Sequence, residues 1–384
     1  MRIVVPTETG SAETRVALSP DIVSRYLKKE GMELAVEAGL GRHCHWSDDL
    51  YREAGCKVVG DRAELLAGAD LVLRVGKPPS DEVGLLPEGS VHVSFLDPFG
   101  ERDLVEALRE RGVTAVSMEM MPRSTRAQKM DALSSQHSIA GYYMVLLAAA
   151  ELGKLLPMMM TPAGTIQPAR VFVIGAGVAG LQAIATAKRL GARIEAFDTR
   201  PVVKEQVESL GGRFVEIDLG ETGQTDQGYA KELTEEQKRK QLEGMKRHCA
   251  QADVVITTAQ LFGRKAPVVV TREMVAAMRP GAVVVDYAVE SGGNVEGSAP
   301  GETVEVGGVR IIGLRNYAGR MALDASRMYA SNLYNMIDEF WDPETKGLRL
   351  DLEDEILAAA VVTHGKELVS PMIRKAYGLE EVAS

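Results

Sequence analysis

The sequence predicts an α/β protein with two Rossmann-like parallel-sheet domains around a cleft, linked by two long helices. Three observations lead to this fold class. Strand-like and helix-like stretches alternate over residues 1–120, which is typical of a parallel sheet with helices on its faces. A glycine-rich turn at residues 175–180 separates a short apolar strand from a helix and starts a second alternating series. Two long apolar helical stretches, at residues 138–154 and 320–341, divide the chain.

Length and composition narrow the classes of function. A chain of 384 residues is long enough for two or three domains that each bury a core. The formal net charge of −10 disfavours nucleic acid and anionic membrane surfaces as direct partners. Three scattered cysteines without a C-x-x-C spacing fit reduced thiols in the cytoplasm. The first residues indicate a strand rather than a signal peptide, and no stretch is apolar over the ~18 residues of a membrane span, so we expect no direct membrane insertion.

The first domain is expected to begin with a strand at 2–5. Its first helix should start at Ser19-Pro20, because proline fits the first helical position. The series has no glycine fingerprint, so it does not indicate a nucleotide site. Further strands are expected at 33–36, 71–75, 91–95 and 114–117, and helices at 48–54, 63–66, 101–111 and 352–361, followed by a helical tail.

Two long helices are interpreted as connectors between the domains. They are expected from about Ser138 to Lys154 and from about Arg320 to Trp341, where apolar residues recur at helical spacing. The chain would thus return to the first domain near its end. The predicted domains are residues 1–136 with 320–384, and residues 137–319.

A polar segment, Glu119 to Gln136, precedes the first connector. It concentrates a cation, an amide, a carboxylate and a hydroxyl within twelve residues, namely Arg123, Gln128, Asp131 and Ser134. We expect it at the mouth of the cleft, where α/β proteins bind ligands. A solvated linker with a helix cap is the alternative.

The strongest motif is Gly175-Ala-Gly177-Val-Ala-Gly180, which follows a strand at 171–174 and opens a helix at 181–190. Gly175 permits the tight turn, Gly177 lets the backbone approach a pyrophosphate, and Gly180 lets helix and strand pack closely. The unpaired N–H groups and the positive dipole end of the helix would face the phosphates. A glycine turn with only a packing role is the alternative, but the flanking elements favour dinucleotide binding.

Asp198 selects the kind of dinucleotide. It ends the next strand, at 193–197, and lies 198 − 175 = 23 positions after the first glycine. A carboxylate at this place accepts from both ribose hydroxyls and repels a 2′-phosphate, so we expect NAD(H) rather than NADP(H). Arg200 is a counter-signal, because an arginine just past this position can bind a 2′-phosphate.

The rest of the second domain continues the alternation, with one long interruption. Residues 218–251 are polar and charged, with an exposed helix expected at 232–247 and Tyr229 before it. A connection of this length is either a lid or a solvated insertion. Further strands are expected at 213–216, 254–257, 282–285 and 309–314, and a further helix at 271–278.

Taken together, these residues resemble the NAD(H)-binding component, domain I or α1 subunit, of proton-translocating nicotinamide nucleotide transhydrogenase. The resemblance extends over essentially the whole chain. Alanine dehydrogenase shares the fold and several of the stretches, and is the competing family. The stretches that carry the resemblance are 13–20, 74–79, 123–136, 175–180, 198–201 and 285–294.

Two departures separate these alternatives. Alanine dehydrogenase places its catalytic histidine close to where Asp97 stands here, and its catalytic aspartate at the position of Glu290. Arg15 and Lys77 resemble the carboxylate-binding pair of that enzyme and remain, and we interpret them as structural. Hydride transfer between two nicotinamides moves no separate proton, so it needs close rings and excluded water rather than a general acid or base.

The resemblance also implies roles for individual residues. Arg123, Gln128, Asp131 and Ser134 would lie beside the nicotinamide, and Gln128 would bridge to the second nucleotide. Arg123 and Asp131 can form an ion pair that fixes the segment. Tyr229 and Gly228 match a mobile loop that closes over NAD(H). The implied cofactor-binding residues are Gly175, Gly177, Val178, Ala179, Gly180, Asp198, Thr199, Arg200, Gly228, Gln241 and Gln260.

The implied assembly has several partners. NADP(H) would be bound by a partner subunit, and proton translocation would belong to membrane-spanning partner subunits. A homodimer on the cytoplasmic face of the bacterial inner membrane is expected, held there through the partners. The six histidines show no convincing ligand spacing, so no metal is predicted, including at His43-x-His45. A non-catalytic NAD-sensing module is a further alternative, disfavoured by the intact Arg123, Gln128 and Asp131.

Overall fold

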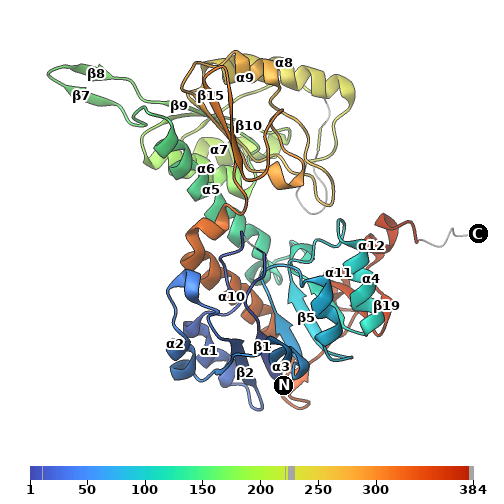
Figure 1. Cartoon of the computed structure of the whole chain (residues 1–384). Coiled ribbons are helices and arrows are strands. Elements are labelled where there is room, and N and C mark those ends of the chain that lie inside the picture. Colours follow the sequence, from blue (N-terminus) through green and yellow to red (C-terminus); the bar gives the residue numbers. More distant parts are fainter. Residues whose placement is uncertain (11, 221, 224–229, 380–384) are drawn as a thin grey trace, which may run out of the picture. The chain divides into compact units, whose positions relative to one another are not determined.

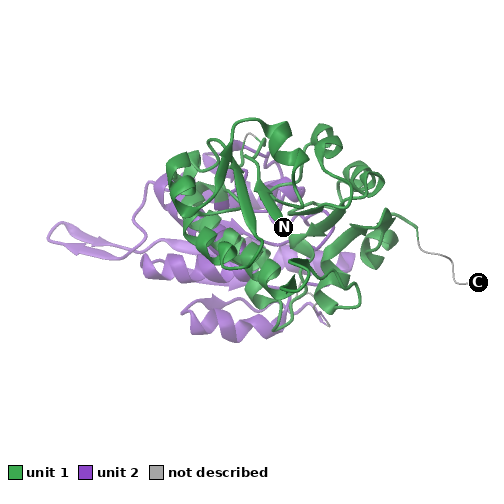
Figure 2. Cartoon of the chain, turned by 90° about the horizontal axis from the view of Figure 1, so that it is seen from below, with its two compact units in different colours: residues 1–136, 319–384 green, residues 137–318 purple. Residues whose placement is uncertain are grey.

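The computed structural model describes residues 1–10, 12–220, 222–223 and 230–379 of the chain (Figure 1). These residues form two compact units (Figure 2). Unit 1 is built from both ends of the chain, Met1–Gln136 and Gly319–Ser384, and unit 2 comprises His137–Ala318. Each unit is an α/β fold around a mainly parallel sheet, so the predicted fold class is confirmed.

Unit 1 is organised around an eight-stranded sheet in the order β19-β18-β6-β5-β4-β1-β2-β3. Strands β1 to β6 run parallel, and at one edge β18 pairs antiparallel with β6 and with β19. The central strands are apolar and buried on both faces, as expected for a parallel sheet covered by helices. The strands are β1 (Arg2–Val5), β2 (Glu33–Glu37), β3 (Lys57–Val59), β4 (Leu71–Leu73), β5 (Val91–Ser94), β6 (Thr114–Ser117), β18 (Val361–His364) and β19 (Glu367–Leu368), with a separate pair β16 (Trp341–Asp342) and β17 (Gly347–Leu348).

The longest helix of unit 1 is α10 (Ala322–Phe340), which packs Ala330, Leu333 and Ile337 into the core with the apolar side chains of β1 and β4. Helix α1 starts with Pro20 at its first position, as predicted. The other helices are α1 (Pro20–Leu27), α2 (Asp48–Ala54), α3 (Arg62–Ala67), α4 (Arg102–Arg111), α11 (Glu355–Ala360) and α12 (Pro371–Ala376), with 3₁₀ turns η1 (Arg42–Cys44), η2 (Ser80–Leu85), η3 (Met118–Met120) and η4 (Gln128–Met130).

The C-terminal region differs from the predicted helix at 352–361 followed by a helical tail. Helix α11 ends at Ala360, and the chain then forms the β18–β19 hairpin before α12. Gly365 and Lys366 occupy the two turn positions with φ of +56° and +65°. A two-residue turn with both φ angles positive matches the twist of the flanking strands, so this β-branched run pairs as a hairpin.

Unit 2 contains a seven-stranded sheet in the order β11-β10-β9-β12-β13-β15-β14. All its pairs are parallel except β14–β15. Side chains of α5 and α6 pack on one face, and those of α8 and α9 on the other. Its strands are β9 (Arg170–Ile174), β10 (Arg193–Phe197), β11 (Arg213–Phe214), β12 (Val254–Thr257), β13 (Val283–Asp286), β14 (Glu302–Val306) and β15 (Val309–Gly313). Its helices are α5 (Ala132–Glu151, which starts in unit 1), α6 (Val178–Arg189), α7 (Lys204–Ser209), α8 (Glu235–Gln251) and α9 (Arg272–Ala276), with 3₁₀ turns η5 (Pro201–Val203) and η6 (Val289–Ser291). The 3₁₀ turn η7 (Ala318–Met321) begins at the last residue of unit 2 and continues into unit 1.

Two hairpins of unit 2 were not predicted. The β14–β15 hairpin turns at Gly307 and Gly308, whose φ angles are +61° and +81°. The other hairpin, β7 (Met159–Thr161) with β8 (Gly164–Ile166), lies apart from the main sheet and projects from unit 2 (Figure 1). Both turns use two residues between paired positions, which is the commonest hairpin geometry.

The first connector helix begins earlier than predicted. Helix α5 starts at Ala132 rather than Ser138, so Ser134 lies in its first turn and not in the segment before it. The second crossing between the units is made by η7, and α10 lies wholly in unit 1. Within the described residues, no helix is both long enough and apolar enough to span a membrane.

Candidate functional site

The glycine turn of unit 2 joins β9 to α6 at the carboxyl edge of the sheet. Gly175 has a φ of +97°, and its N–H donates to the Phe197 carbonyl at 2.8 Å. A Cβ on Gly180 would lie 1.9 Å from the Gly175 carbonyl oxygen. The predicted conformational roles of Gly175 and Gly180 are therefore confirmed, because one needs a positive φ and the other close packing of helix on strand.

Gly177 leaves open space at the start of α6. The nearest atom to a Cβ at Gly177 would be Nη2 of Arg200, at 4.0 Å. Helix α6 starts at Val178 rather than at Leu181 as predicted, so Val178, Ala179 and Gly180 form its first turn. The N–H groups of a first turn have no partner within the helix. This arrangement fits the pyrophosphate of a dinucleotide, which needs close backbone approach and N–H donors.

Asp198 directly follows β10 and lies beside this turn. Its Oδ2 accepts from the Ala176 N–H at 2.7 Å, and its Oδ1 accepts from the Arg200 N–H at 2.8 Å. The Arg200 side chain donates to both oxygens, and this hydrogen bonding raises the pKa of Arg200. The structure thus pairs Asp198, the predicted ribose acceptor, with Arg200, although the sequence pattern predicts that Asp198 favours NAD(H) and that Arg200 favours NADP(H).

The segment after β12 borders the glycine turn from the other side, because β12 is the neighbour of β9. Thr258 donates its hydroxyl to the Gly175 carbonyl at 2.9 Å. Asn294 brackets Ala259, accepting from its N–H at 3.0 Å and donating to its carbonyl at 2.8 Å. Gln260, a predicted binding residue, follows directly. Neighbouring parallel strands whose connections diverge form the crevice in which such sheets bind ligands.

Thr258, Asp286 and Asn294 were missed as supports of this turn. Asp286 ends β13 and is fully buried, with its carboxylate accepting from Asn294 N–H at 3.0 Å and from the Ser298 hydroxyl at 2.5 Å. A buried carboxylate with several donors fixes the loop around it. For Thr258 and Asp286 the available signal was a polar residue at or directly after the end of a buried strand, whereas Asn294 lies in the loop after η6 and has no such signal.

Four further predicted residues remain, of which the structure describes two, Gln241 and Thr199. Gln241 lies on the buried face of α8 with Met245 and Cys249, so the helix expected to be exposed in fact covers the sheet. Thr199 accepts from the Thr222 hydroxyl through its carbonyl at 2.6 Å. Gly228 and Tyr229 lie outside the described residues.

The predicted hydride-transfer segment belongs to unit 1. Gln128 is exposed in η4, and its side chain has no hydrogen-bond partner among the described residues. Arg123 is exposed as well. Asp131 accepts from the Ser134 N–H at 2.9 Å and from the Ser134 hydroxyl at 2.6 Å. The bond from the Ser134 N–H is that of a helix N-cap, and the bond from the hydroxyl adds to it, so Asp131 and Ser134 together mark the start of α5.

Arg15 and Lys77 are both paired with carboxylates of the chain. Arg15 donates to both oxygens of Glu13, at 2.8 and 2.7 Å, and to Gln136 at 2.9 Å. Lys77 lies 2.5 Å from Glu101 and 3.6 Å from Asp97. Glu290 accepts from the Asn316 N–H at 3.0 Å. The pairing of Arg15 with Glu13 and of Lys77 with Glu101 agrees with the interpretation of the two cations as structural.

Within the described part of the chain, no three His, Cys, Asp or Glu side chains are grouped so that they could hold a metal ion. The site is instead a strand–glycine turn–helix unit followed by an acidic residue at the end of the next strand. This combination defines a dinucleotide-binding α/β protein.

Comparison with known families names the class more closely. Residues 4–140 match the model of the alanine dehydrogenase/PNT N-terminal domain, and residues 144–371 match that of the C-terminal domain. The chain belongs to the alanine dehydrogenase/PNT family.

Relatives of the chain within this family include transhydrogenase subunits and alanine dehydrogenases, and they differ in their identity to it. The chain is 46% identical to the first portion of NAD(P) transhydrogenase subunit alpha of Rhodospirillum rubrum, over 97% of this chain and 99% of that protein. It is 39% identical to the protein of the same name from Rickettsia prowazekii, over 98% of each. Alanine dehydrogenase of Mycobacterium tuberculosis is 32% identical, over 78% of this chain and 76% of that protein.

Solved structures give the same order. A transhydrogenase from Sinorhizobium meliloti superposes with a TM-score of 0.84 at 42% identity, covering 97% of this chain and 100% of that one. An L-alanine dehydrogenase superposes with a TM-score of 0.80 at 26% identity, covering 98% and 99%. The transhydrogenases are thus the nearer relatives in both sequence and structure, and alanine dehydrogenase is more distant.

Proposed function

We propose that the chain is the NAD(H)-binding subunit of a proton-translocating NAD(P) transhydrogenase of the Si-specific/Re-specific type. It exchanges hydride between NAD(H) and NADP(H) held on a partner subunit. The observation that carries this proposal is the similarity to the alpha-subunit protein of the Rhodospirillum transhydrogenase, over 97% of this chain and 99% of that protein. The similarity to alanine dehydrogenase is lower and covers less of each chain.

The glycine turn supports the binding of NAD(H) in unit 2. The first-turn N–H groups of Val178, Ala179 and Gly180 would donate to the pyrophosphate, above the open space at Gly177. Asp198 would accept from the adenosine ribose. When bound, the nicotinamide ring supplies or accepts the hydride. The further proposed contacts come from Gly175, Thr199, Arg200, Gln241 and Gln260, and from Gly228 with Tyr229 in a closing loop.

The segment from Arg123 to Ser134 would position the nicotinamide rather than move a proton. Gln128 offers an exposed amide without a partner among the described residues, so it can both donate to and accept from a carboxamide or a ribose. Asp131 is engaged in capping α5 through Ser134, which favours a structural carboxylate over a titrating base. Hydride transfer is accelerated by holding the two rings in a fixed geometry and excluding water.

Three observations weigh against the alternatives. An amino-acid dehydrogenase needs a free cation for its substrate carboxylate, but Arg15 and Lys77 are each paired with a carboxylate of this chain. It also needs a proton-transfer group at the reacting carbon, and Asp97 and Glu290 stand where alanine dehydrogenase places its histidine and aspartate. A non-catalytic NAD sensor would have no use for an exposed Gln128 beside a rigid helix cap.

The proposed assembly is a homodimer that meets membrane-spanning and NADP(H)-binding partner subunits on the cytoplasmic face of the bacterial inner membrane. The β7–β8 hairpin supports self-association, because Met160 is 74% exposed and Ile166 42% exposed on it. An isolated two-stranded hairpin is marginally stable in water, so a second copy of the chain would stabilise it by covering these side chains.

The deciding experiment compares two reactions of the purified chain. Alone, it should not oxidise NADH with pyruvate and ammonium at an enzymatic rate. Mixed with an NADP(H)-binding partner subunit, it should transfer hydride from NADH to an NADP⁺ analogue whose reduced form absorbs at a separate wavelength. Amino-acid formation by the chain alone, without hydride exchange in the mixture, would overturn the proposal.

A further inference from the structure

One side chain of α10 joins the two halves of the segment that carries Gln128 and Ser134. The Asn332 Nδ2 donates to the Lys129 carbonyl at 3.0 Å, and its Oδ1 accepts from the Ser135 hydroxyl at 2.7 Å. Lys129 is the neighbour of Gln128, and Ser135 is the neighbour of Ser134. Asn332 is only 8% exposed, whereas Gln128 is exposed. The buried amide of Asn332 therefore holds the backbone next to Gln128, whose own amide is exposed.

The two bonds close a ring around the helix cap. Residues 129–135 form the chain side of this ring, with Asp131 near their centre, and Asn332 forms the other side. The Asp131 carboxylate bonds to Ser134 inside the ring. As a result, the separation between the η4 turn and the first turn of α5 depends on one amide as well as on the local cap.

We infer that Asn332 is a positioning residue for hydride transfer, acting through the backbone of Lys129 on the side chain of Gln128. This inference rests on the proposed function. A misplacement of about 1 Å at a reacting pair can cost on the order of a hundredfold in rate. Gln128 lies in a 3₁₀ turn, which has poorer hydrogen-bond geometry than an α-helix, so an external anchor has more influence there.

An amide is the side chain that this place requires. It must donate to a carbonyl on one side and accept from a hydroxyl on the other, and asparagine does both. An aspartate would keep the acceptor but set a charge against the Lys129 carbonyl. Asn335, one helical turn further, also donates to that carbonyl at 3.0 Å, but the structure gives it no bond to Ser135. Asn335 is therefore a matched control, because it bonds to the Lys129 carbonyl but does not connect that carbonyl to Ser135.

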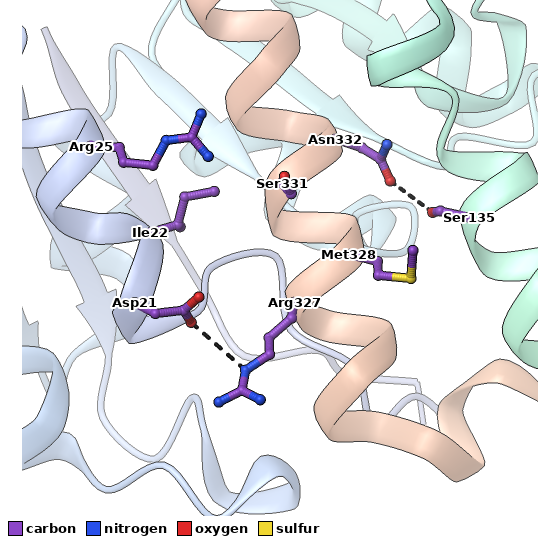
Figure 3. Close-up of a pocket in the computed structure, with 8 residues that line it drawn as sticks. All are labelled: Asp21, Ile22, Arg25, Ser135, Arg327, Met328, Ser331 and Asn332. Carbon is purple, nitrogen blue, oxygen red and sulfur yellow. Dashed lines mark hydrogen bonds and ion pairs between the residues drawn. The ribbon is translucent and has the colours of Figure 1, made fainter.

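Asn332 and Ser135, which bond to each other, border open space, so either side chain can be truncated without creating a sealed cavity. Ser135 and Asn332 line a groove of about 360 Å³ together with Ser331 and Met328, and Figure 3 shows the Asn332 amide pointing toward Ser135. Truncating either side chain widens this groove and leaves no sealed cavity, so the stability cost should be small compared with a core truncation. Ion pairs of Arg126 and Lys129 with Glu339 hold the same turn from outside the groove.

The experiment measures hydride transfer in the mixture with the NADP(H)-binding partner, at saturating NADH and NADP⁺ analogue. We expect Asn332→Ala to lower the maximal rate about tenfold or more, with the NADH dissociation constant of the isolated chain changed less than twofold. Ser135→Ala, a milder change, should lower the rate several-fold. Asn335→Ala should stay within twofold of the parent. Thermal unfolding of each variant is recorded, and the rate is compared below the onset of unfolding.

A cycle with Gln128 separates positioning from a merely structural role. If Asn332 acts through Gln128, Asn332→Ala should add little further loss in a Gln128→Ala background, because the side chain it positions is absent. Equal losses in both backgrounds would overturn the inference, as would parental rates for both Asn332→Ala and Ser135→Ala. A parental rate for Gln128→Ala alone would instead overturn the proposed role of Gln128.

Discussion

Arg200 and Asp198 form a two-contact ion pair in which Nε lies 2.9 Å from Oδ1 and Nη2 lies 2.8 Å from Oδ2. The N–H groups of Ala176 and Arg200 donate to the same carboxylate. A carboxylate has about four acceptor positions, so these four bonds occupy it. If Asp198 binds the adenosine ribose of NAD(H) as proposed, the ribose diol must displace the guanidinium, so Arg200 would compete with the ribose for this carboxylate.

The Arg200→Leu variant tests this competition. Without the guanidinium, Asp198 is free for the diol, and the cation that could bind a 2′-phosphate is gone. If breaking the pair costs ~1 kcal/mol, the NADH dissociation constant should fall about fivefold. NADPH should bind more weakly than to the parent. Titration of both nucleotides by their fluorescence measures the two constants.

Asp198→Ala is the complementary variant. It removes an ionised acceptor, and hydrogen bonds to charged groups contribute about 1.5–3 kcal/mol, so NADH should bind at least tenfold more weakly. Because Arg200 then lacks the Asp198 carboxylate that neutralises it, the preference for NADH over NADPH should narrow. Parental NADH affinity in Asp198→Ala, or weaker NADH binding in Arg200→Leu, would contradict the assignment.

Substitutions of two glycines in the turn should have different effects, one on the stability of unit 2 and the other on NADH binding. A Cβ at Gly180 would lie 1.9 Å from a backbone carbonyl oxygen, so Gly180→Ala should destabilise unit 2 by roughly 3 kcal/mol or more, at the upper end of overpacking costs. A Cβ at Gly177 meets nothing closer than 4.0 Å, and its φ of −77° suits any residue. Gly177→Ala should therefore fold normally but lose NADH affinity, because its methyl group occupies the pyrophosphate space.

Chemical denaturation and NADH titration of the two variants check this contrast. Gly177→Ala should keep the denaturation midpoint of the parent while its NADH dissociation constant rises at least tenfold. If Gly177→Ala binds NADH like the parent, the pyrophosphate does not approach this turn.

Local rules are enough to predict most strands of the two main sheets, most helices and the glycine turn. Positive φ at Gly175 and close packing at Gly180 are demands of a single turn, and a short motif records them. The β18–β19 hairpin is also signalled locally, by the β-branched run before Gly365, but the predicted helix extends into that run. The predicted start of α5 is too late, because the cap of Asp131 on Ser134 is hard to distinguish among the polar residues around it.

Contacts between distant residues could not be predicted. Asn332 and Lys129 are 203 positions apart, and neither belongs to a motif. The pairing of Arg200 with Asp198 is local, but its geometry depends on the turn at Ala176, which lies 22 positions earlier than Asp198. The sequence therefore predicts candidate site residues, while the supports that orient them follow from tertiary packing.

His92 on β5 should limit the acid stability of unit 1. It is fully buried, and neither ring nitrogen has a hydrogen-bond partner among the residues that the structure describes. Burial lowers its pKa to about 3, helped by the charge of Arg74. Between pH 6.5 and 3 the unfolded chain binds the proton and the folded chain does not, so the free energy of unfolding falls as the pH is lowered. At ~1.4 kcal/mol per pKa unit, the loss at about pH 4.5 is roughly 2–3 kcal/mol.

The His92→Leu variant should remove this loss. We expect it to match or exceed the parent at about pH 7.5, because an unpartnered polar ring is replaced by an apolar side chain, and to exceed it clearly at about pH 4.5. Urea denaturation at both pH values measures the difference. Replacing the exposed His43 by leucine is the control, and a parental pH dependence in His92→Leu would contradict the argument.

Gln128→Asn tests whether hydride transfer depends on how far the exposed amide of Gln128 extends from the backbone of η4. The variant keeps the amide and shortens the side chain by one methylene, so the group recedes by about 1 Å, a displacement that can cost on the order of a hundredfold in rate. NADH binding to the isolated chain should change little, since the nucleotide contacts proposed for unit 2 are intact. The rate should show no dependence on a single ionisation in the range of histidine. Parental hydride transfer in the mixture with the partner subunit would exclude a positioning role for Gln128.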